Sequence, residues 1–173
     1  SLEKDSIFLS LIAIQEEPRK GSLELINHAK QANIQLVLTS PFKLSWITIT
    51  ALSFGLIQKG EKVGVINGDN LDKVRKAVDD IYQEEIEIVG ISGYSIEFLS
   101  KTENGEALFK KVKRVLIEKA EPQNVADFVS FLRSSKINKT VLGAGHSIYD
   151  SVFLEKSNLS VSVHIDSASP CDF

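Results

Sequence analysis

The sequence predicts an α/β protein, built as a three-layer α/β/α sandwich around a mainly parallel, Rossmann-like sheet. Two observations lead to this fold class. Short apolar runs alternate with stretches of helical periodicity along the whole 173-residue chain, and this alternation is the pattern of repeated βαβ units. The composition, with 43% apolar and 25% charged side chains, is that of a globular protein with one domain over residues 1–173.

The apolar runs predict seven strands. We expect them at residues 7–14, 34–39, 63–66, 86–91, 115–120, 139–143 and 159–164. The first run, Ile7 to Ile14, is almost continuously apolar, which indicates a buried strand, and the residues from Gln15 to Pro18 end it in a turn.

Helices are expected between these strands. One follows Pro18 and ends at Asn33, with Leu23, Ile26 and Ala29 facing inward. Another places Leu71, Val74, Val78 and Ile81 on one face, with Asp69 as its N-cap. Residues 43–54 contain the strand-like alternation Ile47-Thr48-Ile49-Thr50. A βαβ order nevertheless requires a helix here, so we predict a buried helix.

Charge and cysteine content exclude several classes of protein. The chain has 20 basic and 23 acidic side chains and a net charge of −3, which argues against a nucleic-acid partner. Its one basic cluster, residues 110–114, is expected to be a solvated helix end. Cys171 is the single cysteine, which excludes an internal disulfide and indicates a reducing compartment. The longest uncharged run, residues 44–58, is shorter than the ~20 residues of a membrane helix, so we expect the chain itself to be soluble.

The stretch from Lys139 to Leu154 is the strongest candidate for a functional segment. A short apolar strand leads into a Gly-rich turn, and Asp150 opens a helix. The segment Gly145-His146-Ser147-Ile148-Tyr149-Asp150 resembles the hinge motif Gly-Asp-Gly-x-Asn-Asp of P-type ATPases and their haloacid-dehalogenase relatives. His146 stands at the position of the first carboxylate and Tyr149 at that of the Asn. Of the magnesium-holding groups that the resemblance implies, only Asp150 remains.

A second block of resemblance covers residues 17–41. The family has an acidic-Pro-Arg turn, a helix, and a strand that ends in a Thr-Gly-Asp phosphate loop. This chain has Glu17-Pro18-Arg19 and then Thr39-Ser40-Pro41. Thr39 is kept, whereas Ser40 and Pro41 replace the Gly and the Asp, and Pro41 has no backbone N–H. The tripeptide Gly68-Asp69-Asn70 is an alternative phosphate loop.

Five such blocks lie in the family order between Ile7 and about Val163. Val125 occupies the position of the phosphate-binding Lys, three residues after Pro122, and no Asp is followed by Lys-Thr-Gly. The resemblance therefore implies the phosphorylation domain of a P-type ATPase-like cation or lipid transporter, on the cytoplasmic face of a membrane, with degenerate catalytic loops and a structural or regulatory role. Its partners would be the nucleotide-binding and transmembrane parts of a parent chain. Magnesium and ATP enter only through the family, and no cofactor is expected for this chain.

The resemblance also predicts a defect in the sheet. In the family, the strand that bears the phosphorylated Asp lies beside the strands that end here at Thr39 and Gly143. Without it, these two strands would pair with each other or leave backbone groups that need a partner, so we expect a rearranged sheet or self-association through a sheet edge.

Other functions stay open at this point. The chain could be an autonomous haloacid-dehalogenase-type phosphohydrolase that uses Asp150 or Asp69 as its carboxylate. It could also be a Rossmann-like nucleotide binder with Gly143-Ala144-Gly145 as a phosphate turn, although the third Gly of that fingerprint is missing. Three further candidate sites have weaker signals. His146 with Asp150 could form a metal pair, and Cys171 with His164 or His146 could act as nucleophile and base. His28 is expected on a solvated helix surface.

Overall fold

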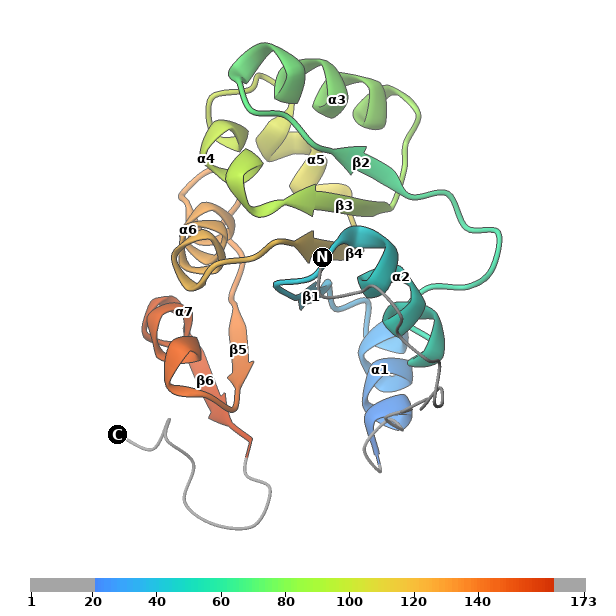
Figure 1. Ribbon diagram of the computed structural model, residues 1–173, viewed down its shortest axis with the longest axis vertical. Helices are drawn as coiled ribbons and strands as arrows, with labels where there is room; N and C mark the ends of the chain where they lie inside the picture. Colours follow the sequence, from blue (N-terminus) through green and yellow to red (C-terminus); the bar gives the residue numbers. More distant parts are fainter. Residues whose placement is uncertain (1–20, 164–173) are drawn as a thin grey trace, which may run out of the picture.

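The computed structural model describes residues 21–163. The expected strand at 7–14 lies outside the described residues, as do His164 and Cys171. Within the described part the fold is α/β with a four-stranded parallel sheet of order β1-β4-β3-β2 and a two-stranded parallel sheet of β5 and β6 (Figure 1). The strands are β1 (Leu36–Thr39), β2 (Gly64–Ile66), β3 (Ile88–Ser92), β4 (Arg114–Glu118), β5 (Leu142–Gly145) and β6 (Leu159–Ser162).

Helices connect every strand to the next. The α-helices are α1 (Ser22–Gln31), α2 (Leu44–Ser53), α3 (Leu71–Gln83), α4 (Ile96–Leu99), α5 (Gly105–Lys111), α6 (Pro122–Arg133) and α7 (Ser151–Lys156). Two 3-10 turns, η1 (Gly93–Ser95) and η2 (Ile148–Asp150), precede α4 and α7. The chain thus has the predicted βαβ order from α1 to β6.

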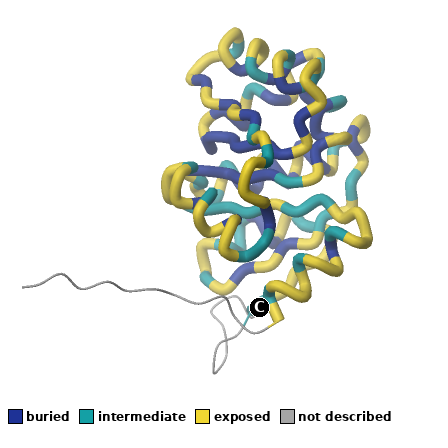
Figure 2. The backbone as a smooth tube through the Cα atoms, turned by 90° about the vertical axis from the view of Figure 1, so that its right-hand side faces the viewer, coloured by how far each residue is buried: buried dark blue, intermediate teal, exposed yellow. Residues whose placement is uncertain are grey.

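The helices pack against both faces of the four-stranded sheet. Alternate residues of β4 point to opposite faces: Val115 and Ile117 pack in a cluster with α3, α4, α5 and α6, whereas Leu116 packs with α2. Ile26 of α1 lies on the α2 side. Strands β3 and β4 are buried along almost their whole length, whereas most residues of β6 are exposed. Figure 2 shows buried residues in the interior of the described part and exposed residues along its outside.

Most of the predicted elements that fall in the described part are present. All six expected strands there are found, with ends shifted by up to three residues, and residues 44–53 are helical as predicted. Asn33, the predicted stop of α1, has the left-handed φ of 53° that commonly ends a helix. Val125 is buried in the core as predicted.

Three predictions need correction. The N-cap of α3 is Asn70, whose side chain accepts the backbone N–H of Lys73, and not Asp69. Helix α2 is not a buried helix: Ile47 and Ala51 face the core, but Trp46 is 66% and Ile49 is 63% exposed. Finally, Gly143-Ala144-Gly145 belongs to strand β5 and not to a turn. Each glycine there lets the strand approach the following helix, because a Cβ on Gly145 would lie 2.5 Å from Cβ of Asp150.

The sheet is interrupted between β1 and β5. Strand β1 pairs with β4 alone among the described strands, and β5 pairs with β6 alone. The small sheet is held in place through α7, which packs against α6. Of the helices between residues 21 and 163, none combines the length and the apolar character needed to cross a bilayer.

Candidate functional site

The carboxyl ends of the parallel strands are the place where this fold would hold a ligand. Thr39 ends β1, Ser92 ends β3 and Glu118 ends β4. Strands β1 and β4 are neighbours, yet α2 follows β1 on one face and α6 follows β4 on the other. Such a switch in connection leaves a crevice outside the two strand ends in many α/β proteins.

In this chain the loops that follow β1 and β4 hydrogen-bond to each other and close that crevice. Ser40 donates its backbone N–H to the carbonyl of Ile117 at 3.0 Å, and its own carbonyl accepts the N–H of Ala120 at 3.0 Å. The N–H of Lys119 donates to the carbonyl of Phe42, also at 3.0 Å. The amide of Ser40 is therefore engaged, and Pro41 has none. Thr39 and Ser40 do not form a cradle of free N–H donors for a phosphate.

Glu118 is the most strongly engaged side chain at these strand ends. It is buried, with 6% exposure. Its Oε2 accepts the backbone N–H of Leu44, the first residue of α2, at 2.7 Å, and its Oε1 accepts the hydroxyl of Ser92 at 2.5 Å. The carboxylate thus caps the positive end of α2 and ties β3 to β4. The sequence predicts Glu118 inside a strand and does not predict this role; the available signal is an acidic residue at the end of an apolar run.

The loop after β2 forms a second polar group together with η1. The hydroxyl of Ser95 bonds both the N–H and the carbonyl of Gly68, at 3.0 and 2.9 Å, and the hydroxyl of Tyr94 donates to the Asn67 side chain. Here too the Gly68 amide is engaged within the protein. Nothing in the sequence indicates that Tyr94 and Ser95 contact this loop, because they follow a different strand, β3.

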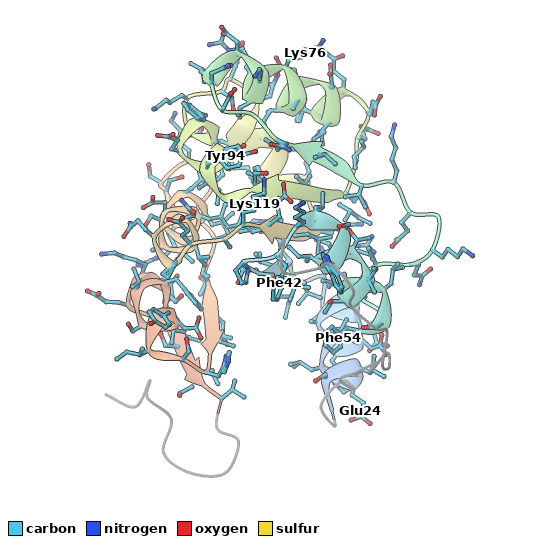
Figure 3. All side chains as sticks on the ribbon, viewed as in Figure 1. Glu24, Phe42, Phe54, Lys76, Tyr94 and Lys119 are labelled. Carbon is cyan, nitrogen blue, oxygen red and sulfur yellow. The ribbon has the colours of Figure 1, made fainter. Side chains whose placement is uncertain are left out.

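Two lysines lie beside this second group. Lys73 Nζ lies 2.8 Å from Oδ1 of Asp69 on the exposed surface. That hydrogen bond lowers the pKa of Asp69 and raises the pKa of Lys73. Lys119 Nζ lies 5.6 Å from the centre of the Tyr94 ring, and Figure 3 shows the two side chains next to each other. The Lys73–Asp69 ion pair shows that Asp69 is a solvated partner of a lysine.

Asp150 holds the turn after β5. Its Oδ2 accepts the backbone N–H groups of His146 and Ser147, both at 2.9 Å, and lies 3.6 Å from Nδ1 of His146. Asp150 also begins α7, as the sequence predicts. Tyr149 points outward, with 72% exposure. The Asp150 carboxylate therefore serves as a cap of its own loop.

The three candidate phosphate loops are not brought together. Strands β1 and β2 lie at opposite edges of the four-stranded sheet with two strands between them, so Thr39 and Gly68 are roughly 14 Å apart in the sheet direction. Gly145, His146 and Asp150 belong to the separate sheet and α7. Within residues 21–163, no three His, Cys, Asp or Glu side chains are grouped so that they could hold a metal ion. The residues around Asp150 do not fit magnesium, because one carboxylate already engaged by two amides offers too few oxygen ligands.

Thr39 and Gly143 do share one feature, an elongated cavity of about 780 Å³ between the two sheets. We call it the inter-sheet cavity. Strand β1 lines one side and β5 the other. Apolar side chains of α1, α6 and α7 line much of the rest, together with Lys110, Lys111 and Lys113 before β4. Its lining residues include Leu25, Ala29, Leu36, Val37, Val125, Phe128, Val129, Leu132, Val141, Leu142, Ala144 and Phe153, with Lys139 and Gln35 at one end.

Comparison with known proteins assigns no class to this site. The chain matches no known protein family, and a search of curated proteins finds no relative.

Proposed function

We propose that this chain is the phosphorylation-domain segment of a P-type ATPase-like cation or lipid transporter, with a haloacid-dehalogenase-like three-layer arrangement and degenerate catalytic loops. In this proposal it acts as a structural, coupling or regulatory element on the cytoplasmic face of a membrane. The observation that carries the proposal is the break in the sheet between β1 and β5, because the family places its phosphorylated-Asp strand between the strands that end here at Thr39 and Gly143. The five ordered blocks of resemblance support the same assignment.

The groups that phosphoryl transfer needs are missing or occupied. The transfer requires a nucleophilic Asp, magnesium held by carboxylates, and a Lys and Thr that balance the phosphate charge. Val125 is buried at the position of the Lys. His146 replaces one carboxylate, and Asp150 accepts two backbone N–H groups. Loss of one preorganised charge-stabilising group commonly costs about 3 kcal/mol, or ~10² in rate, and a missing nucleophile blocks the covalent step altogether.

The alternative, an autonomous phosphohydrolase, has less support. Its two candidate carboxylates are Asp150, which caps its own turn, and Asp69, which pairs with Lys73 on the surface. They lie on different sheets, so they do not share one magnesium ion.

The first test measures phosphorylation directly. The purified chain is incubated with magnesium and radiolabelled ATP or acetyl phosphate, and beryllium fluoride is titrated by calorimetry. We expect no covalent label and no magnesium-dependent fluoride binding. Acid-stable, hydroxylamine-sensitive label that Asp150→Asn abolishes would instead identify a divergent but active phosphotransfer site.

The second test addresses the transporter itself. The complete reading frame that contains these residues is expected to encode apolar membrane spans, which the proposal requires. A frame without any span would rule out the transporter assignment even if the phosphorylation result were negative.

A further inference from the structure

The inter-sheet cavity lies between two strand edges, those of β1 and β5, that pair with no further described strand. Leu36 of β1 donates its backbone N–H to the carbonyl of Lys113, the residue before β4. Ser40, the residue after β1, donates its N–H to the carbonyl of Ile117 in β4. Because alternate residues point to opposite sides of a strand, the backbone groups of Val37 and Thr39 point away from β4, toward the cavity. No described strand pairs with them.

The facing edge of β5 has the same property. The carbonyls of Val141 and Gly145 accept N–H groups from Leu159 and Val163, which belong to β6 and the residue after it. By the same alternation, the backbone groups of Leu142 and Ala144 point away from β6. Two parallel edges therefore flank one cavity, and the unpaired N–H and C=O groups along each edge can pair with a further strand.

The path of the chain shows which segment fits between these edges. The connection from β1 across the sheet to β2 places its helix, α2, on one face of the sheet. The connections in the opposite direction, from β2 to β3 and from β3 to β4, place α3 and α5 on the other face. All these crossovers therefore have the same hand, as parallel βαβ units do. Helix α1 lies on the α2 face, so a strand that precedes α1 must lie on the free side of β1. By the same rule, the connection from β4 through α6 runs in the direction of β1, so β5 lies on the far side of the position beside β1.

We propose that residues 7–14 bind in the inter-sheet cavity as a strand parallel to β1 and β5, and so join the two sheets into one of order β6-β5-(7–14)-β1-β4-β3-β2. The segment precedes α1 by seven residues, which span at most about 23 Å when extended. Its nearly continuous apolar run is what a parallel strand covered on both faces requires. Here those faces are α1, through Leu25 and Ala29, and α6, through Phe128 and Val129.

A lysine at one end of the cavity supports the same register. Lys139 precedes β5, and Gln35, which precedes β1, accepts a hydrogen bond from Lys139 Nζ at 2.8 Å. Burial lowers the pKa of Lys139, and no carboxylate between residues 21 and 163 forms an ion pair with it. A strand parallel to β1 would bring Asp5, two residues before Ile7, to this end. The acidic side chain would balance the half-buried ammonium group.

This inference does not rest on the transporter assignment, but it has a consequence for it. A chain that fills the position with its own segment leaves no room there for a strand bearing a phosphorylated Asp.

Nuclear magnetic resonance of the full chain tests the proposal. In a uniformly labelled sample we expect cross-strand nuclear Overhauser effects from residues 7–14 to Val37 or Thr39 on one side and to Leu142 or Ala144 on the other. An equimolar mixture of labelled and unlabelled chain, recorded with isotope filtering, should show none of these effects between molecules. Effects seen only between molecules would identify a second copy as the occupant, and an absence of effects from residues 7–14 to either strand would also overturn the proposal.

Two variants test the same contact by hydrogen exchange. Leu11→Asp should speed exchange of the Val37 and Thr39 amides by about 100-fold, because an inserted charge opens the strand locally. Ile49→Asp, on the exposed face of α2, is the matched control and should leave these amides unchanged. Lys139→Asp should also speed exchange, and the added change Asp5→Lys should restore protection. Equal exchange in Leu11→Asp and the unmodified chain, or no rescue by Asp5→Lys, would contradict the proposed strand or its register.

Discussion

In this protein, individual carboxylates near strand ends stabilise loops and helix ends. Glu118 and Asp150 both lie where a ligand site is expected, yet each accepts two hydrogen bonds from within the chain. A carboxylate with its oxygens engaged in this way orders a loop or a helix end instead of binding a ligand. Their substitution should therefore change the free energy of unfolding.

Asp150→Ala should lower the free energy of unfolding by about 1–3 kcal/mol, since the N–H groups of His146 and Ser147 lose a charged acceptor. Asp150→Asn keeps a carbonyl oxygen in place and should retain most of the stability. Urea unfolding of the three proteins, with and without magnesium, measures both effects. Stabilisation by magnesium that is lost in Asp150→Asn would show that this carboxylate holds a metal ion.

Glu118→Ala should be more damaging, by about 2–4 kcal/mol, because it removes the cap of α2 and leaves the Leu44 N–H and the Ser92 hydroxyl without their partner in the core. Glu155, exposed on α7, provides a matched control whose change to Ala should stay within about 0.5 kcal/mol. Thermal unfolding followed by circular dichroism distinguishes them. Equal melting temperatures for the two variants would contradict the capping role.

At the scale of elements, ion pairs connect loops to the sheet. The loop before β2 is held by Glu61, whose Oε2 lies 2.8 Å from Nη1 of Arg114 at the start of β4. Burial alone would raise the pKa of Glu61. The hydrogen bond from the N–H of Gln58 and the Arg114 guanidinium outweigh that effect, and the pKa is held below 4.5.

This lowered pKa predicts the pH dependence of stability. A carboxyl whose pKa is lower in the folded state contributes stability above its unfolded pKa, and this contribution is lost as the pH falls through the folded pKa. Glu61→Gln should therefore reduce stability at pH 7 and flatten the loss of stability below about pH 4.5. Chemical unfolding at a series of pH values measures the two slopes. Parallel curves for the variant and the unmodified chain would show that the ion pair contributes nothing.

Helix α2 shows how an element can be predicted while its surroundings are not. Its apolar residues and its place in the βαβ order indicated a buried helix, and the helix is present. Only Ile47 and Ala51 face the core, because α2 lies on the outside of the sheet and is covered on one side only. When a helix has apolar residues on all its sides, the sequence does not predict which side the rest of the chain will cover.

At the scale of the molecule, the break between the two sheets is the main feature. Strands β1 and β5 do not pair with each other; among the described strands, β1 pairs with β4 alone and β5 with β6 alone. The inter-sheet cavity separates β1 from β5. The family resemblance predicts that these two strand edges need a partner. The transporter proposal attributes the break to an absent phosphorylated-Asp strand, whereas the further proposal places residues 7–14 there.

The candidate site was only partly predictable from the sequence. Thr39, Gly68 and Asp150 were correctly expected at or just beyond the ends of strands, because an apolar run followed by polar or small residues has a local signature. That Ser40 contacts Ala120, or that Gly68 contacts Ser95, has no such signature. These contacts arise from strands that are neighbours in space and distant in the chain.

The sequence by itself determined the α/β order and the approximate positions of the strands and helices in the described part, because periodicity of apolar residues is a local property of the chain. The tertiary structure alone decided which strands are neighbours, which carboxylates became caps, and where the sheet is interrupted. Strand order depends on pairing between residues far apart in the sequence. Which backbone N–H and C=O groups lack a partner is known only once the neighbours of every strand are known.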